Sequence, residues 1–396
     1  MVNIDYIKTF AVIGAGTMGR EIAQVALMAG FEEVVLNDIN PITLENALNY
    51  IEDGLKKLEI KGQLYPGLTT DLLMSRLTEE KDLYEAVKNA DFIVEAIPEK
   101  MDLKQDLFKK LGQYAPKHTI FATNTSTMSI TKIAESCNRP DKVVGMHYFV
   151  PVPLLQLIEV IKGRKTSEDT MEICILVGKK LPSIKGKRFI ARIEKESPGF
   201  IVNRLNIAGC MHINWLLDEA MEKGIPWENI DADFGSLQKY GPIAKWDYLG
   251  LDTIYNTFKY FEEILSTDFA PGKALTKLVN EGNLGRKTNK GFYEWTKNGN
   301  PKIDKAEKAH LFNNEIFMAL ELNEGCRLLE EGIVSGYKVI DDTMLAGMSM
   351  PGPFGPGKRN YEKWSKLLED LVKKTGKKYF LPCDLMKSGQ FLKMRK

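Results

Sequence analysis

The segment that decides the fold of the N-terminal half reads Phe10-Ala11-Val12-Ile13-Gly14-Ala15-Gly16-Thr17-Met18-Gly19. Its first four residues are apolar, and they predict a buried strand over residues 10–13. The G-x-G-x-x-G spacing that follows lets the backbone turn sharply and approach a pyrophosphate closely. It also directs the first N–H groups of a helix toward the phosphate charge. The segment therefore predicts the first βαβ unit of a dinucleotide-binding fold.

An acidic residue extends this motif. Asp38 follows a second apolar run at 34–37 and lies 19 positions after Gly19. A carboxylate at the end of the second strand can accept hydrogen bonds from an adenosine ribose, and it repels a 2′-phosphate. The pattern therefore favours NAD over NADP. The alternative is that the motif binds no dinucleotide and consists of a glycine-rich turn and an Asp that caps a helix.

Short apolar runs alternate with helical segments as far as residue 160, which is typical of βαβ units and a parallel sheet. Strands are expected at residues 10–13, 34–37, 92–95, 120–123, 143–146 and 155–160. Helices are expected at residues 18–30, 41–61, 102–114 and 167–181. Residues 64–78 show no period, so we expect an extended connection there. The N-terminal half is thus predicted to be an α/β, Rossmann-type doubly wound sheet.

After residue 185 the apolar spacing is mostly helical, apart from a strand-like run at 189–193. A weak repeat relates Glu222-Lys223-Gly224-Ile225 and Ile230-Asp231 to Glu331-Gly332-Ile333 and Ile340-Asp341. We therefore expect an all-α C-terminal region of two tandem helical repeats. The predicted domains are residues 1–196 (NAD-binding), 197–298 (first repeat) and 299–396 (second repeat).

Composition excludes several other classes of protein. Lys and Arg total 54 against 53 for Asp and Glu, and the net charge of +1 argues against a nucleic-acid binder. The 5 cysteines form no C-x-x-C pair, so neither a disulfide framework nor a structural metal site is expected. The sequence shows no apolar signal core and no run of about 18 apolar residues, which predicts a cytoplasmic protein that does not span a membrane.

His147 and Glu159 are the candidates for acid–base chemistry. His147 follows the strand at 143–146, at the carboxyl edge where doubly wound sheets bind ligands, and Glu159 lies in the next strand-like run. If the two strands are adjacent, the carboxylate can fix the tautomer of the imidazole, which is able to accept a proton near neutral pH. On position alone, a structural role for His147 is an equal alternative. We expect surface or core roles for His118, His212 and His310.

Several motifs follow one another in a fixed order along the chain. They are the glycine motif, Asn124-Thr125-Ser126, Gly145-Met146-His147-Tyr148-Phe149 through Pro151-Val152-Pro153, Glu159-Val160, Pro198-Gly199-Phe200-Ile201-Val202-Asn203-Arg204, and Gly285-Arg286-Lys287-Thr288 with Gly291-Phe292-Tyr293. With these motifs in this order, residues 8–295 resemble the L-3-hydroxyacyl-CoA dehydrogenase family. The tail beyond residue 300 is similar to the second helical repeat of multifunctional members.

The resemblance implies NAD-dependent oxidation of a (3S)-3-hydroxyacyl-CoA to the 3-oxoacyl-CoA, with a short-chain substrate such as 3-hydroxybutyryl-CoA favoured. It makes His147 the general base, oriented by Glu159, and it gives Ser126 and Asn203 hydrogen bonds to the substrate. The implied cofactor residues are Gly14, Gly16, Thr17, Met18, Gly19, Asp38, Glu99, Lys104, Asn124, Ser126 and Lys287. The alternatives without a role in function are helix capping for Ser126 and Asn203 and a solvated helix position for Lys104.

The sequence departs from the family pattern at several places. Val150 replaces the asparagine that the family usually carries before Pro151, so cofactor positioning or substrate choice is expected to change. Lys61 falls where the family's phosphate-contacting lysine should fall, whereas Gly54 stands at the matching hydroxyl position. Residues 187–195 are an added stretch, which resembles a β-hairpin arm or a lengthened linker.

Two other functions remain open from the sequence. One is a dehydrogenase of a free hydroxy acid, and the other is a nucleotide-binding protein that has lost catalysis. The expected partners are an acyl-CoA substrate in fatty acid metabolism, a second copy in a homodimer, and functional coupling to an enoyl-CoA hydratase.

Overall fold

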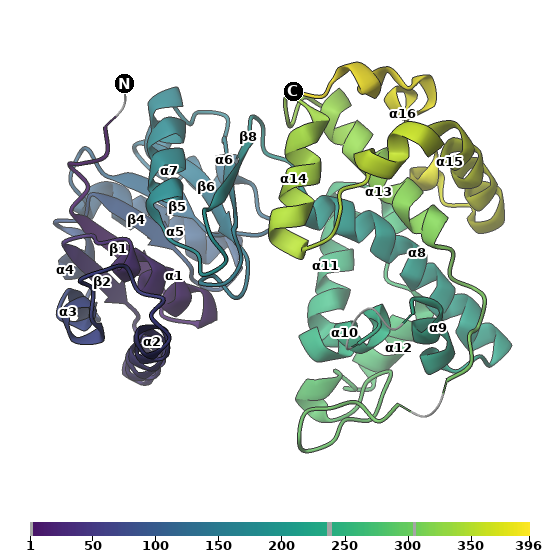
Figure 1. Cartoon of the computed structure of the whole chain (residues 1–396), viewed down its shortest axis with the longest axis horizontal. Coiled ribbons are helices and arrows are strands. Elements are labelled where there is room, and N and C mark those ends of the chain that lie inside the picture. The colour runs from purple at the N-terminus through teal and green to yellow at the C-terminus, as the bar shows by residue number, and fades with distance from the viewer. Residues whose placement is uncertain (1–2, 236–239, 304–305) are drawn as a thin grey trace. The chain divides into compact units, whose positions relative to one another are not determined.

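The computed structural model describes residues 3–235, 240–303 and 306–396. The chain forms two compact units, which we name the Rossmann unit and the helical unit (Figure 1). The Rossmann unit comprises Met1–Val202, Glu331–Gly352 and Lys396, and the helical unit comprises Asn203–Glu330 and Pro353–Arg395. The division into three domains made from the sequence stays a prediction.

The Rossmann unit is built on an eight-stranded sheet of order β3-β2-β1-β4-β5-β6-β7-β8. Its strands are β1 (Thr9–Ile13), β2 (Glu33–Asn37), β3 (Leu77–Glu80), β4 (Phe92–Glu95), β5 (Ile120–Thr123), β6 (Val143–Tyr148), β7 (Leu157–Ile161) and β8 (Phe189–Ile193). Its helices are α1 (Thr17–Met28), α2 (Pro41–Ile60), α3 (Thr70–Met74), α4 (Leu83–Val87), α5 (Met101–Tyr114), α6 (Ile130–Ala134), α7 (Glu168–Lys180) and α14 (Tyr337–Met348). The strands from β3 to β6 run parallel, whereas β7 is antiparallel to β6 and β8 is parallel to β7.

Local sequence explains why these elements form. The central strands β4 and β5 are buried along their whole length, as expected for a parallel sheet covered by helices on both faces. Helix α2 begins at Pro41, and the side chain of Asn40 accepts a hydrogen bond from the N–H of Ile42 at 3.0 Å. Proline at the first helical position and asparagine before it are favourable helix-start signals. The predicted α/β doubly wound fold is thus confirmed.

The expected extended connection at residues 64–78 was wrong in part. It contains helix α3, for which Thr69 accepts a hydrogen bond from the N–H of Leu72 at 3.2 Å, and it ends in strand β3. Residues 77–80 read Leu-Thr-Glu-Glu and none of them is buried, because β3 is an edge strand beside β2. An edge strand that needs little apolar burial leaves little periodic signal in the sequence.

The added stretch at 187–195 is neither a hairpin arm nor a linker. It forms β8, the other edge of the sheet, which pairs with β7 from Leu157↔Phe189 to Ile161↔Ile193. The residue after β8 is Glu194, and its N–H donates a backbone hydrogen bond of 2.9 Å to the carbonyl of Ile333. The stretch therefore extends the sheet and leads into the segment that precedes α14.

Helix α14 packs on strands β7 and β8, although it lies far along the chain from both. The contact is close, because a Cβ atom at Gly347 would lie 2.5 Å from the Cδ2 atom of Leu157. This part of the tail therefore belongs to the core of the Rossmann unit.

The helical unit is made of helices from both parts of the C-terminal region. They are α8 (Val202–Lys223), α9 (Trp227–Asp233), α10 (Pro242–Leu249), α11 (Leu251–Ile264), α12 (Lys273–Asn280), α13 (Asn314–Glu330), α15 (Phe354–Thr375) and α16 (Asp384–Ser388). Helix α8 begins one residue before the first residue of the helical unit, Asn203. Helix α13 packs on α8 closely enough that a Cβ atom at Gly209 would lie 2.3 Å from the ring of Phe317. The two parts of the C-terminal region therefore share one core.

The two halves of the predicted repeat carry the same local arrangement. Asp231 accepts hydrogen bonds from the N–H groups at the start of α10, and a Cβ atom at Gly241 would lie 2.4 Å from its Oδ1 atom. Asp341 lies over Gly352 in the same way, with the corresponding distance 2.1 Å. In both halves the glycine directly precedes a proline at the start of a helix, which is α10 after Gly241 and α15 after Gly352. These two Asp–Gly contacts agree with the tandem repeat that the sequence predicts.

Glu321 on α13 is expected to make the stability of the helical unit depend on pH. The side chain is 1% exposed, its Oε2 atom has no hydrogen-bond partner in the described part of the chain, and burial raises its pKa to about 8. The unfolded chain ionises this carboxyl near its ordinary pKa of 4.5. The contribution of protonated Glu321 to the free energy of unfolding is therefore fully present below pH 4.5. It falls as the pH rises toward 8, by at most about 1.4 kcal/mol per pH unit.

Glu321→Gln is expected to remove this slope between pH 5 and 8, because glutamine carries no proton to lose. Free energies of unfolding from urea titrations at several pH values would measure the difference between variant and wild type. The difference should grow in favour of the variant as the pH rises, and parallel curves would show that Glu321 titrates normally.

Candidate functional site

The glycine motif forms the turn between β1 and α1. Gly14 has φ +102°, and a Cβ atom there would lie 2.6 Å from the carbonyl oxygen of Ala96, so only glycine fits. A Cβ atom at Gly19 would lie 1.7 Å from the carbonyl oxygen of Gly14, whereas one at Gly16 would meet no atom within 4 Å. The turn is therefore closed on the protein side and open at Gly16, as a cradle for a pyrophosphate requires.

Asp38 lies directly after β2 and is tied to this turn. Its Oδ2 atom accepts a hydrogen bond of 2.9 Å from the N–H of Ala15, and its Oδ1 atom accepts one of 2.9 Å from the N–H of Asn40. Because a carboxylate has about four acceptor positions, both oxygens can still accept from ribose hydroxyls. The residues present fit the adenosine end of NAD.

A histidine–glutamate pair lies where β6 and β7 meet. His147 and Glu159 are cross-strand partners, and His147 Nδ1 lies 2.7 Å from Glu159 Oε2. The imidazole side chain is 7% exposed and the glutamate side chain is fully buried. A carboxylate at Nδ1 keeps a proton on that nitrogen and leaves Nε2 as the acceptor. The structure therefore forms the pair that the sequence predicts.

The backbone that enters α8 holds the other oxygen of Glu159. The N–H groups of Ile201 and Val202 each donate to Glu159 Oε1 at 3.1 Å. Phe200 has φ +54°, a left-handed conformation that is uncommon for a bulky residue, and it follows Gly199 at φ +73°. This turn aims two consecutive N–H groups at the carboxylate, and their hydrogen bonds fix its orientation.

Aromatic rings flank His147. The ring of Phe149 lies 4.4 Å from the imidazole and the ring of Phe200 lies 5.6 Å from it, both measured between ring centroids. They restrict the orientation of the imidazole and limit its contact with water.

A buried ion-pair network connects the predicted cofactor residues beside β4 and β5. Lys104 is 1% exposed, and its Nζ atom lies 2.5 Å from Glu95 Oε1 and 3.2 Å from Glu99 Oε2. Glu99 Oε1 in turn accepts a hydrogen bond of 3.0 Å from the N–H of Ser126. The structure thus brings Glu99, Lys104 and Ser126 together, and it excludes the solvated alternative for Lys104.

Glu95 is the residue that the sequence interpretation missed. It is fully buried at the end of β4, and it also accepts hydrogen bonds from the hydroxyl of Thr123 at 2.6 Å and the N–H of Ile97 at 2.8 Å. A glutamate that ends an apolar strand was the available signal, because a charged residue is rarely buried without a partner.

The remaining predicted residues are spread over both units. In the Rossmann unit, Asn124 Oδ1 accepts a hydrogen bond of 3.0 Å from the N–H of Tyr148, which adjoins His147. Lys61 is exposed at the end of α2, and Gly54 packs so closely on Gln24 that a Cβ atom there would lie 2.9 Å from its amide. In the helical unit, Asn203 lies in the first turn of α8, and Lys287 Nζ lies 2.6 Å from Asp252 Oδ1.

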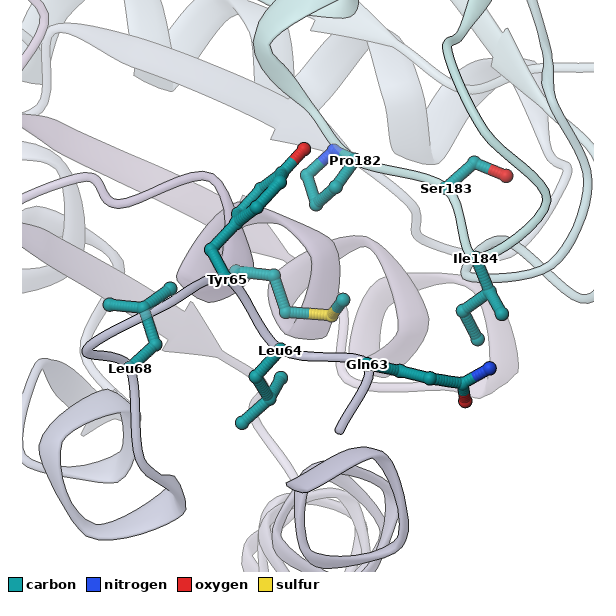
Figure 2. A pocket seen from close by; sticks show the side chains of 8 residues that line it. Gln63, Leu64, Tyr65, Leu68, Pro182, Ser183 and Ile184 are labelled. Carbon is teal, nitrogen blue, oxygen red and sulfur yellow. The ribbon is translucent and has the colours of Figure 1, made fainter. Parts of the chain in front are cut away.

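A small cavity of about 160 Å³ lies beside the connection that follows α2 (Figure 2). Its lining consists of Met28, Gln63, Leu64, Tyr65, Leu68, Pro182, Ser183 and Ile184. None of these side chains carries a charge, so the cavity supplies no cation for a phosphate. None of them belongs to the predicted site.

Within residues 3–235, 240–303 and 306–396, no cluster of His, Cys, Asp and Glu could hold a metal ion. None of the helices in those ranges is long and apolar enough to cross a membrane. The 5 cysteines are all free thiols.

Comparison with known proteins places this geometry in a family. Residues 9–187 match the model of the NAD binding domain of 3-hydroxyacyl-CoA dehydrogenase, and residues 199–295 match the model of its C-terminal domain. A probable 3-hydroxybutyryl-CoA dehydrogenase from Deinococcus radiodurans is 38% identical over 72% of this chain and 99% of its own length. The fatty acid oxidation complex subunit alpha of Shewanella loihica is 32% identical over 97% of this chain and 55% of its own length.

A solved structure agrees over nearly the whole chain. The 3-hydroxybutyryl-CoA dehydrogenase of Escherichia coli K12 is similar at a TM-score of 0.83 and 25% identity, with 98% of each chain covered. The match includes the C-terminal tail, which lies beyond the two family models. The chain belongs to the 3-hydroxyacyl-CoA dehydrogenase family.

Proposed function

We propose that the chain oxidises a (3S)-3-hydroxyacyl-CoA to the 3-oxoacyl-CoA with NAD, and that short-chain substrates such as 3-hydroxybutyryl-CoA are preferred. The observation that carries the proposal is the buried His147–Glu159 pair in a chain whose residues 9–187 match the family's NAD-binding domain. The names of the relatives from D. radiodurans and E. coli support a short acyl chain.

In this mechanism His147 Nε2 accepts the proton of the 3-hydroxyl group, while Glu159 at Nδ1 stabilises the imidazolium that forms. Bound NAD supplies the acceptor for the hydride that leaves C3. Glu159 keeps its position because the N–H groups of Ile201 and Val202 hold its second oxygen. In the reverse direction the imidazolium returns its proton to the ketone oxygen.

The other residues are assigned positioning and binding roles. Ser126 and Asn203 hydrogen-bond the substrate oxygens, and Lys61 contacts a phosphate of CoA. Cofactor contacts come from the glycine motif with Thr17 and Met18, and from Asp38, Glu99, Lys104, Asn124, Ser126 and Lys287. The Glu95–Lys104–Glu99 network supports this assignment, because it fixes the backbone N–H of Ser126 beside the carboxyl ends of the strands.

The S. loihica relative is named as a subunit of a fatty acid oxidation complex, which supports a place in fatty acid metabolism. Coupling to an enoyl-CoA hydratase, a homodimer and a cytoplasmic location stay predictions.

The proposal is tested by following NADH oxidation with acetoacetyl-CoA, with free acetoacetate and with NADPH as comparisons. We expect kcat/KM to be at least about tenfold higher for the CoA ester than for the free acid, because binding of the CoA part contributes to transition-state stabilisation. We also expect at least about a tenfold preference for NADH over NADPH, equivalent to 1.4 kcal/mol of charge repulsion by Asp38.

Asp38→Asn is the matched control for the cofactor preference, since it keeps the acceptor oxygen and removes the charge. It should narrow the preference for NADH. A preference of the wild type for free acetoacetate would favour the hydroxy-acid alternative, and inactivity with every substrate would favour the protein that has lost catalysis.

A further inference from the structure

Glu21 is a buried carboxylate to which the proposed mechanism gives no role. It lies in the first turns of α1, two residues after Gly19, and it is 3% exposed. Its Oε2 atom accepts a hydrogen bond of 2.6 Å from the backbone N–H of Val152, and its Oε1 atom accepts one of 2.9 Å from the hydroxyl of Tyr50 on α2. A charged group in this environment has to be held by such partners.

Val152 belongs to the loop 149–154, which leads away from His147. While Glu21 holds the N–H of Val152, Arg188 holds its carbonyl, with a hydrogen bond of 2.8 Å from Nη2. The Arg188 guanidinium is buried and donates to further backbone carbonyls of the segments around it, those of Leu155, Leu181 and Pro182. Two buried side chains of opposite charge therefore hold Val152, one at its N–H and the other at its carbonyl. We name this pair of contacts the clamp.

The clamp lies within a short stretch of chain from the acid–base pair. Phe149 is the first residue of the loop and packs on the imidazole of His147 at 4.4 Å, whereas Val150 is 52% exposed and adds little packing of its own. Asn124 fixes the chain before the loop, at the N–H of Tyr148. The position of Phe149 between these points therefore depends on how firmly the loop is held at Val152.

We propose that Glu21, opposed by Arg188, is a positioning residue that fixes the loop 149–154 and, through Phe149, the orientation of His147 toward the substrate. The inference rests on the proposed dehydrogenase function. It also gives a role to the added stretch 187–195, which supplies Arg188 immediately before β8.

Glu21 is the better residue to vary, because an Arg188 variant would lose hydrogen bonds to several carbonyls at once and would endanger folding. Glu21→Leu removes both acceptors at similar volume. Glu21→Gln is the conservative variant, since its oxygen can still accept from Val152 and its NH₂ group can donate to the Tyr50 oxygen. Tyr50→Phe is the matched control, because it removes only the hydrogen bond that does not reach the loop.

Three quantities are measured for each variant: kcat and KM with acetoacetyl-CoA, the Kd of NADH from fluorescence, and hydrogen–deuterium exchange of residues 149–154. We expect Glu21→Leu to lower kcat about 10- to 100-fold, since a displacement of about 1 Å at a reacting group has an effect of this size. The Kd of NADH should stay within about twofold and exchange in the loop should accelerate. Glu21→Gln and Tyr50→Phe should remain within about threefold of wild type in kcat.

Unchanged kcat in Glu21→Leu would overturn the proposal. So would a loss of NADH affinity as large as the loss of kcat, because that result would show general damage to α1. If the wild type itself fails to reduce acetoacetyl-CoA, the proposed function is wrong, and the exchange measurement decides separately whether Glu21 holds the loop. Wild-type exchange rates for residues 149–154 in Glu21→Leu would then exclude the clamp.

Discussion

His147→Gln is expected to lower kcat by about two to four orders of magnitude, the range for removal of a general base. Glutamine can still donate a hydrogen bond toward Glu159, but it cannot accept a proton from the 3-hydroxyl group. The Kd of NADH should stay near that of the wild type, because the glycine motif and Asp38 are unchanged. Steady-state kinetics and a fluorescence titration with NADH provide the two measurements.

His118 offers a matched control for this experiment. It also pairs with a carboxylate, with 2.7 Å from its Nε2 atom to Asp91 Oδ1, but its side chain is 51% exposed at the surface of the Rossmann unit. His118→Gln should therefore leave kcat within about twofold of wild type. A His147→Gln enzyme that retains kcat within about tenfold of the wild type would mean that another group is the base.

The second large effect is expected from Glu324→Ala, which should lower the free energy of unfolding by about 3 to 5 kcal/mol. Glu324 is 1% exposed and accepts hydrogen bonds from Arg204 Nε at 2.6 Å, from the hydroxyl of Tyr379 at 2.8 Å and from Arg327 Nη1 at 2.9 Å. Its removal leaves the guanidinium of Arg204, itself 1% exposed, without this counter-charge. Uncompensated buried charge is one of the costliest changes in a protein core.

The pH dependence of this contribution has a defined sign. Burial alone would raise the pKa of Glu324, but the charges of Arg204 and Arg327 outweigh it, and the pKa lies below its ordinary value. The stabilisation is therefore present above the unfolded pKa of 4.5 and is lost as the pH falls through the lowered value. Urea titrations at neutral and acidic pH would measure both effects.

Glu315→Ala is the control for Glu324→Ala, because Glu315 forms an exposed ion pair with Lys363 on the surface of the same unit. Such exposed pairs contribute at most about 1 kcal/mol. If Glu324→Ala cost no more than Glu315→Ala, the buried network would not be a major source of stability in the helical unit.

The sequence alone determined those features that depend on neighbouring residues. The apolar run before Gly14, the glycine spacing and Asp38 are local, and they predicted the first βαβ unit and NAD as the cofactor. Helix starts such as Asn40-Pro41 are local in the same sense. For this reason the Rossmann fold, the mostly helical C-terminal region and the candidates His147 and Glu159 could all be predicted.

Only the tertiary structure decided how residues distant in the chain meet. Strand β7 runs antiparallel to β6, so His147 and Glu159 meet through their register as cross-strand partners, and not because both lie at carboxyl ends of parallel strands. Burial of Glu95 and Glu21 became visible only once their partners, Lys104 and the N–H of Val152, were placed. Hydrogen bonds and ion pairs of this kind depend on three-dimensional packing, which leaves no period and no fixed spacing in the sequence.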